Sequence, residues 1–167
     1  MKKVAILLED YVEESEFMYP FYRFQEEGWE VTVVAPDVRE YRGKNGLKFR
    51  SNVAIREGME NEFDIVFIPG GYAPDRLRRN EKILTFVRRM YELGKPVCTI
   101  CHGPWVLISA GIIKDKKVTG YFAIKDDIKN AGGNYTGAPF ERDGNLFTAQ
   151  DPKAMPGYLK FIIDSIK

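Results

Sequence analysis

Short apolar runs alternate with longer amphipathic segments along the whole chain, and this alternation constrains the fold more than any other feature. The apolar runs predict buried strands, and the segments between them predict helices. We expect strands near residues 4–8, 30–35, 65–68, 96–100, 118–119 and 146–149, and helices near 13–27, 80–93, 103–110, 123–131 and 152–166. Such an order is typical of a mainly parallel sheet with helices on both faces.

Glycines and one irregular segment refine this prediction. Four of the predicted helices are followed by a glycine, as C-terminal caps require: Gly28, Gly94, Gly111 and Gly132. Between residues 38 and 55 the run Gly43-Lys44-Asn45-Gly46 separates short alternating stretches, which predicts a β-hairpin. No linker or repeat interrupts the chain. We therefore expect residues 1–167 to form a single domain, a flavodoxin-like three-layer α/β sandwich with a β-hairpin appendage.

Composition narrows the classes of partner. A chain of 167 residues that is 44% hydrophobic can bury a core without disulfides or a metal. Its 25 basic and 24 acidic residues leave a net charge of +1, which gives no electrostatic basis for binding nucleic acid or a membrane surface. The first apolar run ends at Glu9 and is too short for a signal peptide or a membrane span. With two cysteines in the chain, we expect a cytoplasmic protein.

Cys101 lies where an apolar run meets residues that break a strand. Residues 97–100, Val-Cys-Thr-Ile, indicate a buried strand, and Gly103-Pro104 ends it before the next helix. A side chain in such a turn is exposed at the rim of the sheet and faces a helix N-terminus, which lowers the pKa of a thiol. His102, the only histidine in the chain, follows directly. We interpret Cys101 as a reactive nucleophile.

Cys98 lies three residues earlier, inside the predicted strand. Most free cysteines in such positions are unreactive core residues, and we interpret Cys98 in this way. The spacing Cys98-x-x-Cys101 also occurs in redox dithiols, but those need both cysteines near the start of a helix. One histidine and two cysteines cannot assemble a tetrahedral zinc site by themselves. We expect no metal and no other cofactor.

Three loops follow predicted strands, and they are expected to converge because open α/β sheets bind ligands at the carboxyl ends of their strands. They contain the acidic cluster Glu13-Glu14-x-Glu16, the segment Pro69-Gly70-Gly71-Tyr72 and the segment Cys101-His102-Gly103. The glycine pair lets backbone N–H groups approach a ligand closely, and together with the N–H of His102 it predicts an oxyanion hole beside the thiol. Glu14 and Glu16 by themselves indicate ordinary acidic residues at a helix N-terminus.

Several motifs in combination resemble the ThiJ/PfpI family, and within it the intracellular protease I branch. The resemblance covers nearly the whole chain and is most specific in the Cys-His-Gly-Pro segment, with a Pro-Gly-Gly segment about thirty residues upstream. The matching segments are Tyr19-Pro20, Pro69-Gly70-Gly71-x-Ala73-Pro74, Asn80-Glu81-Lys82, Gly94-Lys95-Pro96, Ile100-Cys101-His102-Gly103-Pro104, Leu107-Ile108-Ser109-Ala110-Gly111, Ile124-Lys125-Asp126-Asp127 and Asn130-Ala131-Gly132.

The resemblance implies roles for individual residues. Cys101 would be the nucleophile, and Glu13 would be the carboxylic acid that hydrogen-bonds it. The N–H groups of Gly71 and His102 would form the oxyanion hole. The pocket would also be lined by Gly70 and Tyr121.

The resemblance also implies a homo-oligomer. His102 would be the general base, oriented by the partner subunit's Asp75, so the active site would lie at a subunit interface. Members form dimers, and the protease branch assembles dimers into hexamers or larger rings. Asp75 stands where that branch usually has a glutamate, and Gln150 stands where an arginine is often found.

These features favour a cysteine-dependent hydrolase. Its substrates would be peptide bonds, or small reactive carbonyls and glycated groups, so protease, glyoxalase and deglycase activities stay open. The alternative is a non-enzymatic protein, a thiol redox sensor or stress-response chaperone in which Cys101 is oxidised. A class I glutamine amidotransferase shares the expected fold but uses a histidine far downstream, and none follows His102.

Overall fold

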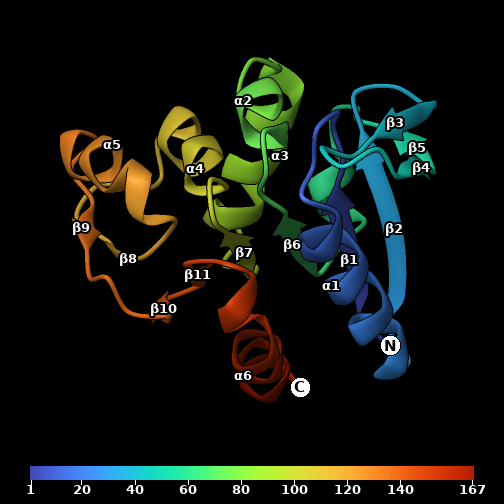
Figure 1. The fold of residues 1–167 in the computed structure, drawn as a ribbon. Coiled ribbons are helices and arrows are strands. Elements are labelled where there is room, and N and C mark those ends of the chain that lie inside the picture. Colours follow the sequence, from blue (N-terminus) through green and yellow to red (C-terminus); the bar gives the residue numbers. More distant parts are fainter.

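The computed structural model describes residues 1–167 and is built around a seven-stranded sheet (Figure 1). The strand order is β10-β11-β7-β6-β1-β2-β5. All neighbouring strands pair in parallel except β10 and β11, which are antiparallel. The strands are β1 (Lys3–Leu7), β2 (Glu30–Ala35), β5 (Val53–Ala54), β6 (Ile65–Ile68), β7 (Val97–Ile100), β10 (Phe140–Asp143) and β11 (Leu146–Ala149).

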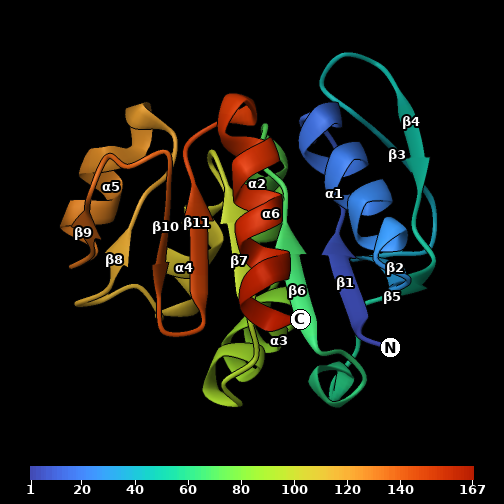
Figure 2. The same cartoon turned by 90° about the horizontal axis from the view of Figure 1, so that it is seen from below.

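Helices cover both faces of this sheet. Helices α1 and α6 lie on one face and α3 and α4 on the other (Figure 2). The helices are α1 (Glu14–Glu26), α2 (Ala73–Leu77), α3 (Glu81–Glu92), α4 (Pro104–Ala110), α5 (Lys125–Asn130) and α6 (Met155–Ile166). Single 3₁₀ turns occupy Met59–Asn61, Phe122–Ile124 and Pro152–Ala154. Not one of the helices combines the length and the apolar character needed to cross a membrane.

The core follows the two-residue period of the strands. In β1, Val4 and Ile6 pack with the residues of α1 and α6, whereas Ala5 and Leu7 pack with those of α3 and α4. All four side chains are completely buried. A central strand that is apolar on both faces requires helices on both faces, and the predicted three-layer architecture is confirmed.

The predicted hairpin is also present. Strands β3 (Glu40–Arg42) and β4 (Lys48–Arg50) pair in antiparallel fashion and form a separate two-stranded sheet. A second small sheet pairs β8 (Lys117–Val118) with β9 (Asn134–Tyr135) in parallel. The glycines predicted as caps, Gly28, Gly94, Gly111 and Gly132, all have positive φ angles.

The sequence-based prediction missed five short elements. These are β5, β9, β10, the five-residue helix α2 and the 3₁₀ turn at Met59–Asn61. Two predicted helices, 123–131 and 152–166, each begin with a 3₁₀ turn before the α-helix starts. The other predicted strands and helices lie within one residue of the observed bounds.

Candidate active site

Cys101 follows β7 directly and has a φ angle of 61°, one of three non-glycine residues with positive φ. This left-handed backbone conformation costs an L-residue roughly 1–2 kcal/mol and is characteristic of functional turns. The surrounding backbone holds it, because the Cys101 N–H donates to Ala149 O at 3.0 Å and its carbonyl accepts from Tyr121 N at 2.8 Å. Gly103 is required two residues later, since a Cβ there would lie 1.6 Å from Thr99 Oγ1.

Two backbone N–H groups face the sulfur of Cys101, those of Gly71 and His102. Gly71 has a φ angle of 75°, and a Cβ at this position would lie 2.3 Å from the nitrogen of Glu13. The loop after β6 can therefore approach the thiol only if this residue is glycine. The structure brings together the two donors predicted for the oxyanion hole.

Glu16, and not Glu13, supplies the carboxyl group in contact with the thiol. The Glu16 side chain is completely buried, and its Oε1 accepts a hydrogen bond of 2.8 Å from the N–H of Gly70. Glu13 lies three residues earlier and lines the same pocket, but its carboxylate faces Lys44 at 3.8 Å. Glu16 therefore occupies the place beside the thiol that was predicted for Glu13, which lies one helical turn earlier.

His102 is held against the thiol by aromatic side chains. Its Nδ1 lies 3.3 Å from Cys101 Sγ. The imidazole stacks on Tyr121 at 4.9 Å between ring centroids and packs edge-on against Trp105 at 5.0 Å. Tyr121 thus lines the pocket as predicted. Gly70, predicted to line it as well, is not among the lining residues and packs behind Cys101, where a Cβ would lie 2.8 Å from Cys101 Cβ.

The prediction of a lowered thiol pKa was wrong for this chain. Burial and the negative charge of Glu16 raise the pKa of Cys101 to about 12, although the N–H groups of Gly71 and His102 act in the opposite direction. Burial also raises the pKa of Glu16 to about 7. Cys101 is only 9% exposed, so desolvation outweighs the stabilisation that a helix N-terminus gives to a thiolate.

The charge state of His102 follows from the same surroundings. Burial lowers the pKa of its imidazole, and the charge of Lys44 lowers it further, against an opposing effect of Asp127. The ring is therefore neutral at pH 7 and can accept a proton. No carboxylate of the same chain is hydrogen-bonded to it.

Asp75 does not reach this pocket within the chain. It lies on α2, forms an ion pair with Arg79, and lines a different hollow beside Trp105 and Asp127. Its predicted role requires a second subunit. Cys98 is completely buried in the sheet, as predicted for a core thiol.

The thiol pocket has a volume of about 360 Å³ and combines all three predicted loops with two unexpected contributors. Its lining consists of Glu13, Glu16, Lys44, Gly71, Tyr72, Cys101, His102, Tyr121, Asp151 and Pro152. Lys44 comes from the β3–β4 hairpin and Asp151 from the end of β11. The Asn-Gly pair in the sequence predicted the hairpin. No feature of the sequence indicated that the tip of this hairpin folds over the thiol.

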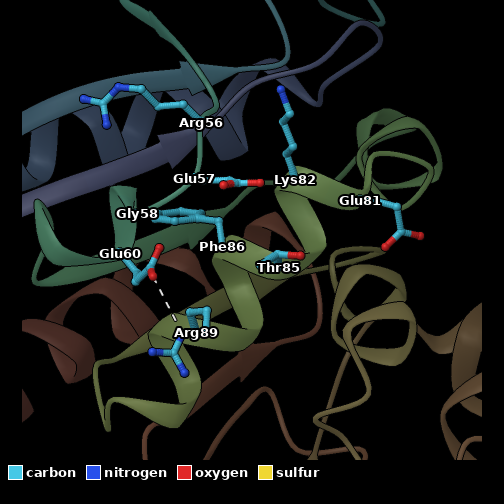
Figure 3. Close-up of a pocket in the computed structure, with 9 residues that line it drawn as sticks. All are labelled: Arg56, Glu57, Gly58, Glu60, Glu81, Lys82, Thr85, Phe86 and Arg89. Carbon is cyan, nitrogen blue, oxygen red and sulfur yellow. Dashed lines mark ion pairs between the residues drawn. The ribbon is translucent and has the colours of Figure 1, made fainter.

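A second hollow of about 360 Å³ lies between α3 and the segment before β6 (Figure 3). Its charged side chains include both signs, and Arg89 pairs with Glu60 across it. It holds no cysteine or histidine. No group of three or more histidine, cysteine, aspartate or glutamate side chains is arranged to hold a metal ion anywhere in the chain.

Fold and site together define a class: α/β proteins with a cysteine in the turn between a central parallel strand and the following helix. The family model described as DJ-1/PfpI matches residues 2–165. The chain belongs to the DJ-1/PfpI family, which confirms the resemblance found in the sequence motifs.

Relatives match over the full length. The protein named Deglycase TK1284 of Thermococcus kodakarensis is 39% identical over 165 residues, which cover 99% of both chains. Protein/nucleic acid deglycase 2 of Escherichia coli is 37% identical over 160 residues, covering 94% of this chain and 93% of that protein. A two-domain protein of Anabaena variabilis, which contains a DJ-1/ThiJ/PfpI-like and a ferritin-like domain, superposes with a TM-score of 0.97 at 39% identity. The match covers 99% of this chain and 48% of that longer one.

Proposed function

We propose that this protein is a cysteine-dependent hydrolase that acts on small reactive carbonyls and on the groups they form with amines, which is a deglycase or glyoxalase type of activity. The observation that carries the proposal is the environment of Cys101: its sulfur lies between the N–H groups of Gly71 and His102 and beside the carboxyl of Glu16. The two relatives named deglycases support the same reaction class.

The proposed reaction begins with a protonated thiol. As Cys101 Sγ forms a bond to the carbonyl carbon, its proton passes to His102 Nδ1, which is 3.3 Å away and neutral. The electron pair of the carbonyl moves to its oxygen, and the N–H groups of Gly71 and His102 stabilise the resulting negative charge. With a 2-oxoaldehyde the adduct is a hemithioacetal, and the Glu16 carboxylate moves the proton of the carbon that carries the sulfur to the neighbouring carbonyl carbon, whose oxygen takes the proton held by His102. The sulfur is then held in a thioester. Water, which gives a proton to His102, attacks the thioester carbonyl, the sulfur leaves as the thiolate and takes that proton back, and a 2-hydroxy acid is released.

Pocket size favours small substrates over polypeptides. The thiol pocket encloses about 360 Å³, close to the lower end of the range typical of small-molecule sites, and Cys101 is 9% exposed. A three-carbon oxoaldehyde or a glycated side chain fits such a volume. Proteolysis needs a path for an extended chain to reach this buried sulfur, so we rank it second.

A redox sensor is supported less well. Sensor cysteines are exposed and have a lowered pKa, because the thiolate is the form that peroxide oxidises. Cys101 is buried and its pKa is raised. Mass spectrometry after mild peroxide treatment tests this alternative, which requires oxidation confined to Cys101 without any turnover.

The test is an activity panel of 2-oxoaldehydes, glycated amino acids and short peptides. Cys101→Ala should abolish turnover while leaving the fold intact, because no other thiol reaches the pocket. Cys98→Ala is the matched control and should retain nearly full activity, since Cys98 is buried in the core. Full turnover by Cys101→Ala would overturn the proposal.

A further inference from the structure

The tip of the β3–β4 hairpin is fixed over the thiol pocket by a buried acid. The Glu14 carboxylate accepts hydrogen bonds from Asn45 N at 2.8 Å, Asn45 Nδ2 at 3.1 Å and Leu47 N at 3.3 Å. The N–H of Lys44 donates to Val12 O at 2.9 Å. At Gly43 a Cβ would lie 2.5 Å from Glu14 Cδ, so the turn fits only without a side chain there. The backbone of Lys44 is thus held beside the pocket that its side chain lines.

Lys44 is the only cationic side chain that lines the thiol pocket. Its nearest carboxylate oxygen, Glu13 Oε1, is 3.8 Å from Nζ, beyond hydrogen-bonding distance. The ammonium group therefore keeps its three donors available. Its side chain is 37% exposed, against 17% for Glu13. A solute that enters the pocket meets this positive charge before it meets the acids behind it.

The three carboxyl groups of the pocket are turned away from an incoming ligand. Glu16 is completely buried against Gly70. The second oxygen of Glu13 is also buried. Asp151 caps the turn that follows it, with Oδ1 accepting from Lys153 N at 3.0 Å. Each of these carboxyl groups already has a partner in the chain, so Lys44 is the charged group that an anionic ligand contacts directly.

We propose that Lys44 binds a carboxylate carried by the substrate, so that the site selects small carbonyl compounds with a negative charge close to the reacting carbon. The inference that such compounds are substrates rests on the proposed function. The recognition itself is a property of the pocket and can be measured without turnover. Lys44 is then a specificity-determining residue that acts directly on the ligand.

The experiment compares two alkylating reagents of nearly equal size, iodoacetate and iodoacetamide, on a Cys98→Ala background. In both reactions Cys101 Sγ forms a bond to the CH₂ carbon, iodide leaves with the electrons of the C–I bond, and the thiol proton goes to solvent. The reagents differ in charge, since one carries a carboxylate and the other a neutral amide. The measured quantity is the ratio of their second-order rate constants, followed by mass spectrometry.

Lys44→Gln should lower the iodoacetate to iodoacetamide ratio about fivefold, the size expected for attraction to a partly exposed ammonium. Lys44→Arg should preserve the ratio. Lys48→Gln is the matched control on the same hairpin, since Lys48 faces Glu40 outside the pocket and its loss should leave the ratio unchanged. The wild-type ratio should also fall as salt is added, because screening weakens the attraction.

An unchanged ratio in Lys44→Gln would overturn the proposal. Equal slowing of both reagents would overturn it as well, because Lys44 would then act on the ionisation of the thiol and not on the ligand. Failure of the proposed function is distinguishable: the activity panel would then show no turnover, while the alkylation ratio would still report whether the pocket prefers anions.

Discussion

At the scale of single residues, the site depends on which acid faces the sulfur. Glu13 and Glu16 are three positions apart and therefore share a face of α1, whereas Glu14 points to the hairpin. The sequence analysis correctly located the acidic cluster at the carboxyl end of β1. It could not tell which of the carboxyl groups faces the sulfur, because that depends on how far α1 is rotated against the loop after β6. The amphipathic period of residues 13–27 could have shown that positions 13 and 16 lie together.

Glu16→Gln should separate the reactivity of the thiol from turnover. As pH rises through about 7, Glu16 loses its proton and its charge then opposes formation of the thiolate. The variant lacks this charge, so its alkylation by iodoacetamide above pH 7 should be at least about threefold faster than that of the wild type. Turnover should fall by roughly 10²–10⁴, because the amide cannot exchange protons.

The matched control for this pair of measurements is Glu26→Gln, an exposed position of the same helix. It should alter neither the alkylation profile nor turnover. Slower alkylation in Glu16→Gln at pH 9 would contradict the repulsion between the carboxylate and the sulfur.

At the scale of elements, strand ends and loops were predicted less well than central strands. Strands β2, β6 and β11 have the predicted bounds, because each is mainly apolar and ends next to a proline or a polar residue. Strand β10 was missed because its sequence, Phe-Glu-Arg-Asp, is mostly polar and lacks the apolar run of a buried strand. It lies at the edge of the sheet and pairs only with β11. The Asp143-Gly144 pair before β11 was a hairpin signal that could have revealed it.

The hairpin provides a prediction at this scale. Glu14→Ala removes an acceptor of three hydrogen bonds, which should destabilise the docked hairpin tip by roughly 1.5–3 kcal/mol. Hydrogen exchange of the Asn45 and Leu47 amides should accelerate accordingly, while the amides of β1 keep their protection. Glu40→Ala, on the exposed side of the same hairpin, serves as control. Unchanged exchange at both tip amides would show that other contacts hold the hairpin.

At the scale of the whole molecule, the isolated chain leaves His102 without a carboxylate to orient it. Asp75 pairs with Arg79 beside a hollow next to Trp105, and we propose that assembly places the partner subunit's Asp75 at the imidazole. The fold of one chain was predictable from its sequence because every strand and helix is local. The expectation that the active site needs two chains came from the family resemblance alone. Local sequence patterns do not indicate which residues of a second chain reach the site.

Mixing two inactive variants tests this assembly. Cys101→Ala and Asp75→Ala should each be inactive or strongly impaired alone. After co-refolding, a dimer with one chain of each kind has one complete site, so about a quarter of the wild-type sites should return. Full activity of Asp75→Ala alone, or no recovery on mixing, would contradict the contribution of the second chain.

The polar edge strand also limits how copies of this chain can associate. Strand β10 has four residues and presents Glu141, Arg142 and Asp143 along the border of the sheet, while the opposite border, β5, has only two residues. Short, charged borders disfavour the addition of a further strand from another molecule. Subunits that meet will therefore join through their helical and loop surfaces, and a continuous intermolecular sheet is not expected.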